Sequence, residues 1–92
     1  MNRTEKAMAE KNLDLLFEFE RYVVEHPSSA AQIPRDATVV LQVKGDEAFN
    51  QWSRRIGETQ AKKAGGPIVE VRISRLGPVR SRIQALEISQ AA

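Results

Sequence analysis

Two short apolar runs with a helical pattern between them form the most regular part of the chain. The run Thr38–Val43 is rich in β-branched residues and too short for a helix, so it predicts a strand. Pro67–Arg75 alternates apolar and polar residues, which predicts a second strand with one buried face. Between them, the apolar residues of Glu47–Ala64 fall within a stripe about 160° wide, as in a helix packed on one surface. This order predicts a βαβ unit with parallel strands.

The pattern near the N-terminus predicts a long helix over Arg3–His26, ended by the proline that follows. Its apolar residues span an arc about 220° wide, whereas a helix on one surface needs somewhat more than about 100°. One sheet cannot cover such an arc. We therefore expect a surplus side, with Leu15, Phe19 and Tyr22, to face the chain's own C-terminal segment or a second copy of the protein.

Residues at the ends of these elements agree with the predicted boundaries. Asn2 is the expected N-cap of the first helix, and Asp46 is the expected N-cap of the helix over Glu47–Ala64. Gly65 is placed to end that helix in a left-handed conformation. The connector over residues 27–36 has room for one helical turn capped by Ser28 or Ser29.

The C-terminal segment is less regular. Leu76-Gly77-Pro78 predicts a turn, and Val79–Ala85 fits both a strand and a helix. Leu86 and Ile88 on either side of an acid favour a last strand. The predicted fold is one domain over residues 1–92, α/β on the border of α+β, in the order α-β-α-β-β. Its three-stranded mixed sheet is expected to be covered on one face by two helices.

Composition narrows the function classes. The 92 residues include no cysteine, which excludes disulfides and cysteine-based catalysis and is compatible with the cytoplasmic location that we expect. No apolar run approaches the length of a membrane span, and the polar N-terminus does not resemble a signal peptide. A small domain without disulfides or metals often gains stability by self-association, so a homodimer is expected.

Charge is unevenly distributed along the chain. Residues 1–47 carry six Lys or Arg against nine acids, whereas residues 48–92 carry eight against three. The asymmetry favours either an anionic partner or two halves that attract each other. The one basic run without an intervening acid consists of Arg72, Arg75, Arg80 and Arg82, which are candidate contacts for nucleic acid or another polyanion.

Three landmarks recur together: Glu25-His26-Pro27 at the end of the first helix, Ile33-Pro34 before a Val-Val strand, and the strand Val71-Arg72-Ile73. With them the chain resembles, over residues 10–76, a family of short bacterial and archaeal proteins described only as a domain of unknown function. The resemblance implies a compact α/β fold without an established activity. It supplies no catalytic residue.

Candidate chemistry is sparse. Lone His26 at a helix end is typical of a dipole contact rather than a metal ligand. Glu20 falls inside the apolar arc, so it is expected either to pair with Arg72, Arg75 or Arg80, to lie at the rim of a dimer interface, or to have a raised pKa as a general acid or base. Lys44-Gly45-Asp46 lacks the glycine series of a phosphate loop and is expected to be a turn and cap. We therefore expect neither enzymatic activity nor a cofactor.

Two function hypotheses remain. The first is a protein-interaction module that self-associates through the first helix, with Leu15, Phe19, Tyr22 and Glu20 as interface candidates. The alternative is an accessory protein that binds nucleic acid or another polyanion through the stretch Arg72–Arg82. The substrate, ligand and partner do not follow from the sequence.

Overall fold

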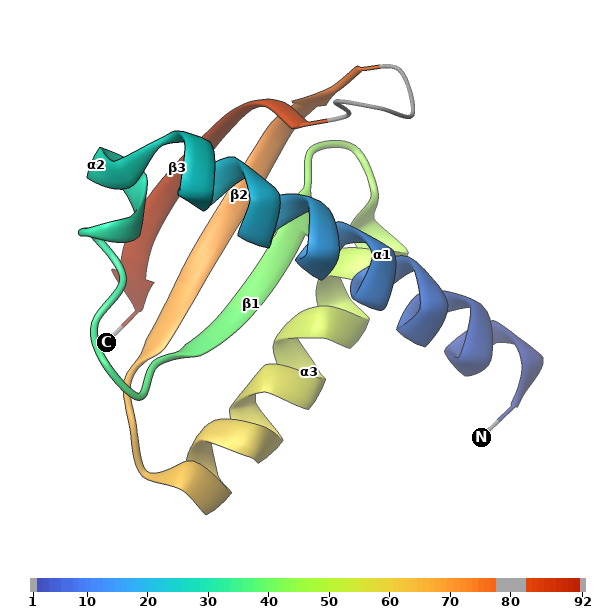
Figure 1. The fold of residues 1–92 in the computed structure, drawn as a ribbon. Helices are drawn as coiled ribbons and strands as arrows, with labels where there is room; N and C mark the ends of the chain where they lie inside the picture. Colours follow the sequence, from blue (N-terminus) through green and yellow to red (C-terminus); the bar gives the residue numbers. More distant parts are fainter. Residues whose placement is uncertain (1, 78–82, 92) are drawn as a thin grey trace.

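The computed structural model describes residues 2–77 and 83–91 as three helices and three strands (Figure 1). In chain order they are helix α1 (Arg3–Glu25), helix α2 (Pro27–Ala30), strand β1 (Thr38–Val43), helix α3 (Glu47–Ala64), strand β2 (Ile68–Leu76) and strand β3 (Ile83–Ala91). The predicted α/β class and order are confirmed, and α2 is the helical turn expected in the connector. The predicted bounds of β1 and α3 are those observed. The predicted α1 is one residue too long at its C-terminal end, and the predicted β2 begins and ends one residue too early.

Local capping explains most of these bounds. Asn2 accepts a hydrogen bond from the Glu5 amide at 2.8 Å, and Gly65 ends α3 at a φ of 79°. The expected caps Ser28 and Ser29 are wrong, because α2 already begins at Pro27 and both serines lie inside it. Proline at the first helical position has its φ already set for a helix, so this turn needs no side-chain cap.

The sheet has the strand order β1-β2-β3. β1 and β2 are parallel, in a register that pairs Leu41 with Val71, and β2 and β3 are antiparallel. β3 begins at Ile83, so residues 83–85 of the ambiguous segment are strand, whereas residues 78–82 lie outside the described residues. The mixed sheet that the βαβ pattern predicted is therefore observed.

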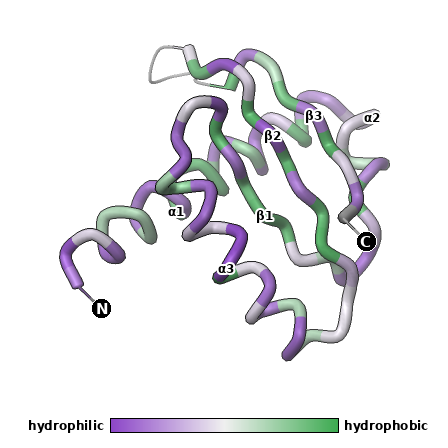
Figure 2. Tube along the Cα trace, turned by 180° about the vertical axis from the view of Figure 1, so that it is seen from behind, coloured by the Kyte–Doolittle hydropathy of each residue, from purple (hydrophilic) through white to green (hydrophobic). Residues whose placement is uncertain are grey.

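The two faces of the sheet are covered differently. α1 crosses the front face (Figure 1), and from behind no helix of the described chain crosses β2 or β3 (Figure 2). Val69 and Val71 are accordingly buried at the front, while Arg72 is exposed at the back. α3 lies along β1 and reaches both faces: Trp52 joins the core, whereas Gly57 packs against Val40, which is on the back face. The prediction that helices cover only one face of the sheet thus holds for β2 but not for β1, which is buried on both faces.

The core lies between α1, the start of α3 and the front of the sheet. Its members are the buried apolar side chains Leu15, Phe19, Leu41, Phe49, Trp52, Val69, Val71, Ile73 and Ile83. The inner side of α1 is therefore fixed to the sheet, and its other side faces solvent.

Candidate functional site

Three large apolar side chains of α1 are exposed. Leu13, Phe17 and Val24 have exposed fractions of 53%, 62% and 80%. Their spacing of four and seven residues places them on one line along the helix, which we call the α1 outer stripe. Single exposed apolar residues are ordinary, but a line of them on one helix is typical of a contact surface.

The inner side of the same helix is in the core. Leu15 and Phe19 are 0% and 4% exposed. Of the two predicted alternatives, a second copy is therefore not what covers them: they lie in the chain's own core, which also contains Ile83 of the C-terminal segment. Tyr22, the third candidate, is half-buried against this core and stacks on His26 at a ring-centroid distance of 3.9 Å. His26 Nδ1 also lies 2.8 Å from the Tyr22 carbonyl oxygen, which gives this histidine a structural role at the end of α1.

Glu20 lies on the exposed side of α1, between Phe17 and Val24 along the stripe. The ion pairs among the described residues do not include it, so the predicted pairing with Arg72 or Arg75 is not observed. Arg80, the third predicted partner, lies outside the described residues. Glu20 is therefore not the buried carboxyl group in an apolar pocket that a role as general acid or base requires.

Only part of the basic run belongs to the residues that the structure describes. Arg72 and Arg75 are exposed on β2, and Arg80 and Arg82 lie outside the described residues. Acidic groups lie on the same face: Glu87 is the register partner of Arg72 on β3, and Glu70 on β2 lies 3.8 Å from Nε of Arg54, which comes from α3. The described back face is therefore a surface of mixed charge.

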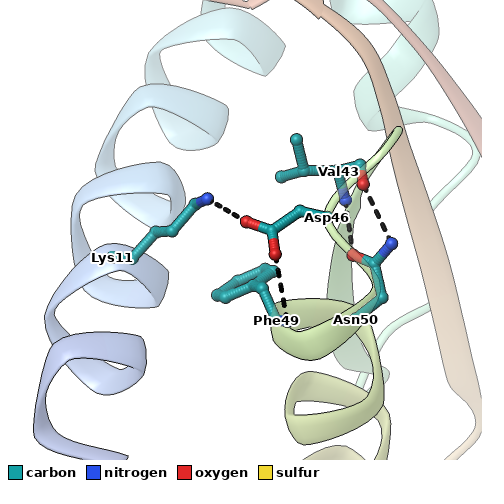
Figure 3. Close-up of polar contacts among 5 residues, drawn as sticks. All are labelled: Lys11, Val43, Asp46, Phe49 and Asn50. Carbon is teal, nitrogen blue, oxygen red and sulfur yellow. Dashed lines mark hydrogen bonds and ion pairs between the residues drawn. The ribbon is translucent and has the colours of Figure 1, made fainter. Parts of the chain in front are cut away.

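The turn between β1 and α3 is fixed by side chains (Figure 3). Lys11 of α1 forms an ion pair with Asp46, and Asp46 also accepts a hydrogen bond from the Phe49 amide at 3.2 Å. The hydrogen bond from Lys11 is the main reason why the pKa of Asp46 is lowered, against the opposing effect of partial burial. Asn50 bonds both backbone groups of Val43, accepting from its N–H at 2.7 Å and donating to its carbonyl at 2.9 Å. Together these contacts confirm the turn-and-cap interpretation of residues 44–46.

Beside this turn is a hollow of about 480 Å³ on the back of the sheet, which we call the β1–α3 groove. Its floor includes Gln42, which is 5% exposed and whose Nε2 has no hydrogen-bond partner among the described residues. Sequence reasoning missed this residue, although it is the one amide side chain in the run that became β1. The charged residues of the lining are Lys44, Glu47, Arg54, Arg72 and Glu87.

Other kinds of site find no support in residues 2–77 and 83–91. These residues contain no cluster of three or more His, Asp or Glu that could hold a metal ion. None of the described helices combines the length and the apolar character needed to cross a membrane. The features that remain are the α1 outer stripe and the β1–α3 groove, which lie on different elements of the fold.

Comparison with curated proteins and with solved structures finds no match. A family model, by contrast, matches residues 7–86, and its description as a family of unknown function confirms the resemblance drawn from the landmarks of the sequence. The match includes α1 from residue 7 onward, the whole βαβ unit and the start of β3. The chain therefore belongs to the family of unknown function DUF5647.

Proposed function

We propose that the protein is a small interaction module that forms a homodimer through the α1 outer stripe. The observation that carries this proposal is the exposure of Leu13, Phe17 and Val24 on the side of α1 that faces away from the core. Leaving three large side chains in water forgoes a favourable free energy that a partner surface would recover. The proposal keeps α1 as the interface but replaces the inner residues by the outer ones.

A second copy fits this stripe because the stripe can pair with itself. In an antiparallel pair of α1 helices centred on Phe17, Leu13 of one copy lies near Val24 of the other, as two-fold symmetry requires. Asp14 and Arg21 are exposed and flank the same edge of the stripe. The antiparallel arrangement brings Asp14 of each copy beside Arg21 of the other, so charge complementarity supports it at two symmetric places.

The expected affinity is modest. Each such side chain contributes about 1.5–3 kcal/mol when fully buried, and the dimer would bury six. Association costs about 4–15 kcal/mol in lost translational and rotational freedom. The difference between these two wide ranges includes the value of about 8 kcal/mol that corresponds to a micromolar dissociation constant, and we take that value as the starting point for the test.

Light scattering coupled to size-exclusion chromatography, from about 1 to 200 μM protein, tests this affinity range. The mass of the native protein should rise toward that of a dimer, and Phe17→Gln should keep the monomer mass throughout. Ala7→Gln is the matched control, because Ala7 is exposed on the same helix but lies off the stripe. A native protein that stays monomeric over the whole range would overturn the proposal.

A charge exchange tests the antiparallel geometry. Asp14→Arg should weaken the dimer by placing like charges beside each other, and Asp14→Arg combined with Arg21→Asp should restore it. If the double variant is no tighter than the single one, the pairing is not the antiparallel one.

The alternative is binding of nucleic acid or another polyanion. Its support is the exposure of Arg72 and Arg75 on β2, and the acids beside Arg72 count against it. It predicts binding to a DNA or RNA duplex at low salt that weakens steeply as salt is added. Replacing Arg72 and Arg75 together by Ala should abolish that binding, and absence of binding by the native protein would remove this candidate.

The cellular setting that we propose is the cytoplasm, since a chain without cysteine needs no oxidising compartment. We assign the module no catalytic role and no cofactor. The proposal for α1 does not depend on either of these points.

A further inference from the structure

Gln42 is the most unusual polar residue of the fold. Its side chain is 5% exposed within β1, directly after the buried Val40 and Leu41. Nε2 carries two N–H donors, and it has no hydrogen-bond partner among the described residues. Since a buried amide without partners destabilises a protein and an apolar side chain of similar size would not, such a residue indicates a group that the amide binds.

The position of Gln42 in the fold agrees with that interpretation. It lines the β1–α3 groove near the carboxyl end of β1, beside the turn that leads into α3. In open α/β sheets, ligands bind in the crevice outside the carboxyl ends of the strands. The groove volume of about 480 Å³ is also that of a small-molecule site.

Arg72 supplies a second donor beside Gln42. The two residues are register partners on the parallel strands β1 and β2, so their side chains leave the same face of the sheet next to each other. Both line the groove, and Arg72 takes part in no ion pair among the described residues. A planar guanidinium next to an amide N–H matches the two oxygens of a carboxylate.

The charges around the groove agree with a ligand of low negative charge. Three cationic residues line it against two acidic ones, which are Glu47 and Glu87. Because Arg54 already pairs with Glu70, the lining has no excess of unpaired positive charge, and its two carboxylates would repel a phosphate dianion more strongly than a monoanion. We propose that the β1–α3 groove binds a small molecule through one carboxylate, which is held by Gln42 Nε2 and the Arg72 guanidinium. This site is separate from the α1 outer stripe and does not rest on self-association.

Titration followed by two-dimensional amide NMR spectra tests the proposal on the full chain. The probes are N-acetylglycine, its neutral counterpart N-acetylglycinamide, and inorganic phosphate. N-acetylglycine should shift the Gln42 side-chain amide and the Gly45 backbone amide saturably, while the neutral probe and phosphate bind about tenfold more weakly or not at all. No saturable shift with N-acetylglycine up to about 50 mM, or phosphate binding at least as tightly, would overturn it.

Two matched pairs of variants identify the donors. Gln42→Met removes the amide at nearly constant volume and should weaken the binding of N-acetylglycine about tenfold or more. It should also raise the melting temperature of the ligand-free protein, because no unpartnered amide is then buried. Gln60→Met is the control, since Gln60 is exposed on α3 outside the groove. Undiminished binding by Gln42→Met would overturn the role of Gln42.

Arg72→Met with Arg75→Met as its control provides a test that leaves β1 untouched. Both arginines are exposed on β2, but only Arg72 lines the groove. Binding of N-acetylglycine should fall about tenfold with Arg72→Met and should be unchanged with Arg75→Met. Equal losses in the two variants would show a diffuse charge effect and would overturn the proposed site.

Discussion

The inner and outer sides of α1 carry the same kinds of residues and have opposite surroundings. Leu15 and Phe19 on the inner side are buried against the sheet, whereas Leu13, Phe17 and Val24 on the outer side are exposed. The inner residues therefore stabilise the single chain, and the outer ones contribute little to it. If the outer half forms the dimer interface that we propose, one apolar arc would serve both folding and association.

The strongest test of this difference between the two sides of α1 is to truncate one phenylalanine on each side and compare the losses of stability. Phe19→Ala should lower the free energy of unfolding by about 3–5 kcal/mol, because it leaves a cavity in the core. Phe17→Ala should change it by less than about 0.5 kcal/mol, because Phe17 is mostly exposed and is not among the side chains packed against the core. Urea unfolding at a protein concentration low enough to keep the chain monomeric measures both values. Similar losses in the two variants would mean that the outer side is also packed within one molecule.

The next largest expected loss of stability concerns the contact of α3 with the back of β1. A Cβ atom added at Gly57 would lie 2.2 Å from Val40 Cγ2, so Gly57→Ala must displace either the helix or the strand. In an exposed helix this substitution is stabilising, but here we expect a loss of about 1–3 kcal/mol from overpacking. Gln60→Ala, on the exposed side of α3, should be nearly neutral. If Gly57→Ala is stabilising in thermal unfolding, α3 does not press on Val40 as closely as described.

Sequence reasoning succeeded where the signal was local. The bounds of α3 follow from Asp46 at one end and Gly65 at the other, and β1 was delimited by its run of β-branched residues. These features depend on neighbours within a few positions, which periodicity and capping describe well.

Sequence reasoning failed where the position of a side chain depended on packing between segments distant in the sequence. Helical periodicity gave the width of the apolar arc of α1, but not the direction from which the sheet approaches it. For Leu15 and Phe19 it therefore left open the chain's own C-terminal segment and a second copy, and the structure places both residues in the core of one chain. Gln42 was overlooked for a related reason: its neighbours on the back face, Arg72 and Arg54, come from β2 and α3. Only the tertiary fold shows that its amide is buried without a partner.

The ion pair between Lys11 and Asp46 connects the inner side of α1 to the start of α3. We expect its loss to cost less stability than the substitutions in the core. Asp46→Ala removes both the ion pair and the helix cap and should cost about 1–2 kcal/mol. Asp46→Asn keeps a capping side chain and should cost only about 0.5 kcal/mol, as is usual for a partly exposed ion pair.

The contribution of the ion pair should depend on pH. Because the pKa of Asp46 is lowered in the folded state, its stabilising effect is complete above the unfolded pKa of about 4 and is lost as the pH falls through the folded pKa. The difference between the native protein and Asp46→Asn, measured by chemical unfolding, should thus be constant near neutral pH and shrink in acid. A difference that grows in acid would contradict the direction of the shift.

The smallest expected change is in the affinity of the proposed dimer and concerns Glu20, the acid on the outer side of α1. In the antiparallel pair centred on Phe17, Glu20 lies at the edge of the stripe opposite to Asp14 and Arg21, where it is on the same side as Glu20 of the other copy, and the like charges weaken association. Glu20→Gln should therefore tighten the dimer about two- to threefold at low salt, equivalent to about 0.5 kcal/mol, without changing the stability of the monomer. Glu25→Gln is the control, because Glu25 is exposed on α1 away from the stripe. Sedimentation equilibrium measures both, and the gain for Glu20→Gln should vanish as salt is added. If Glu20→Gln instead weakens the dimer, this carboxylate pairs with a cation across the interface, and the two helices meet in a different register.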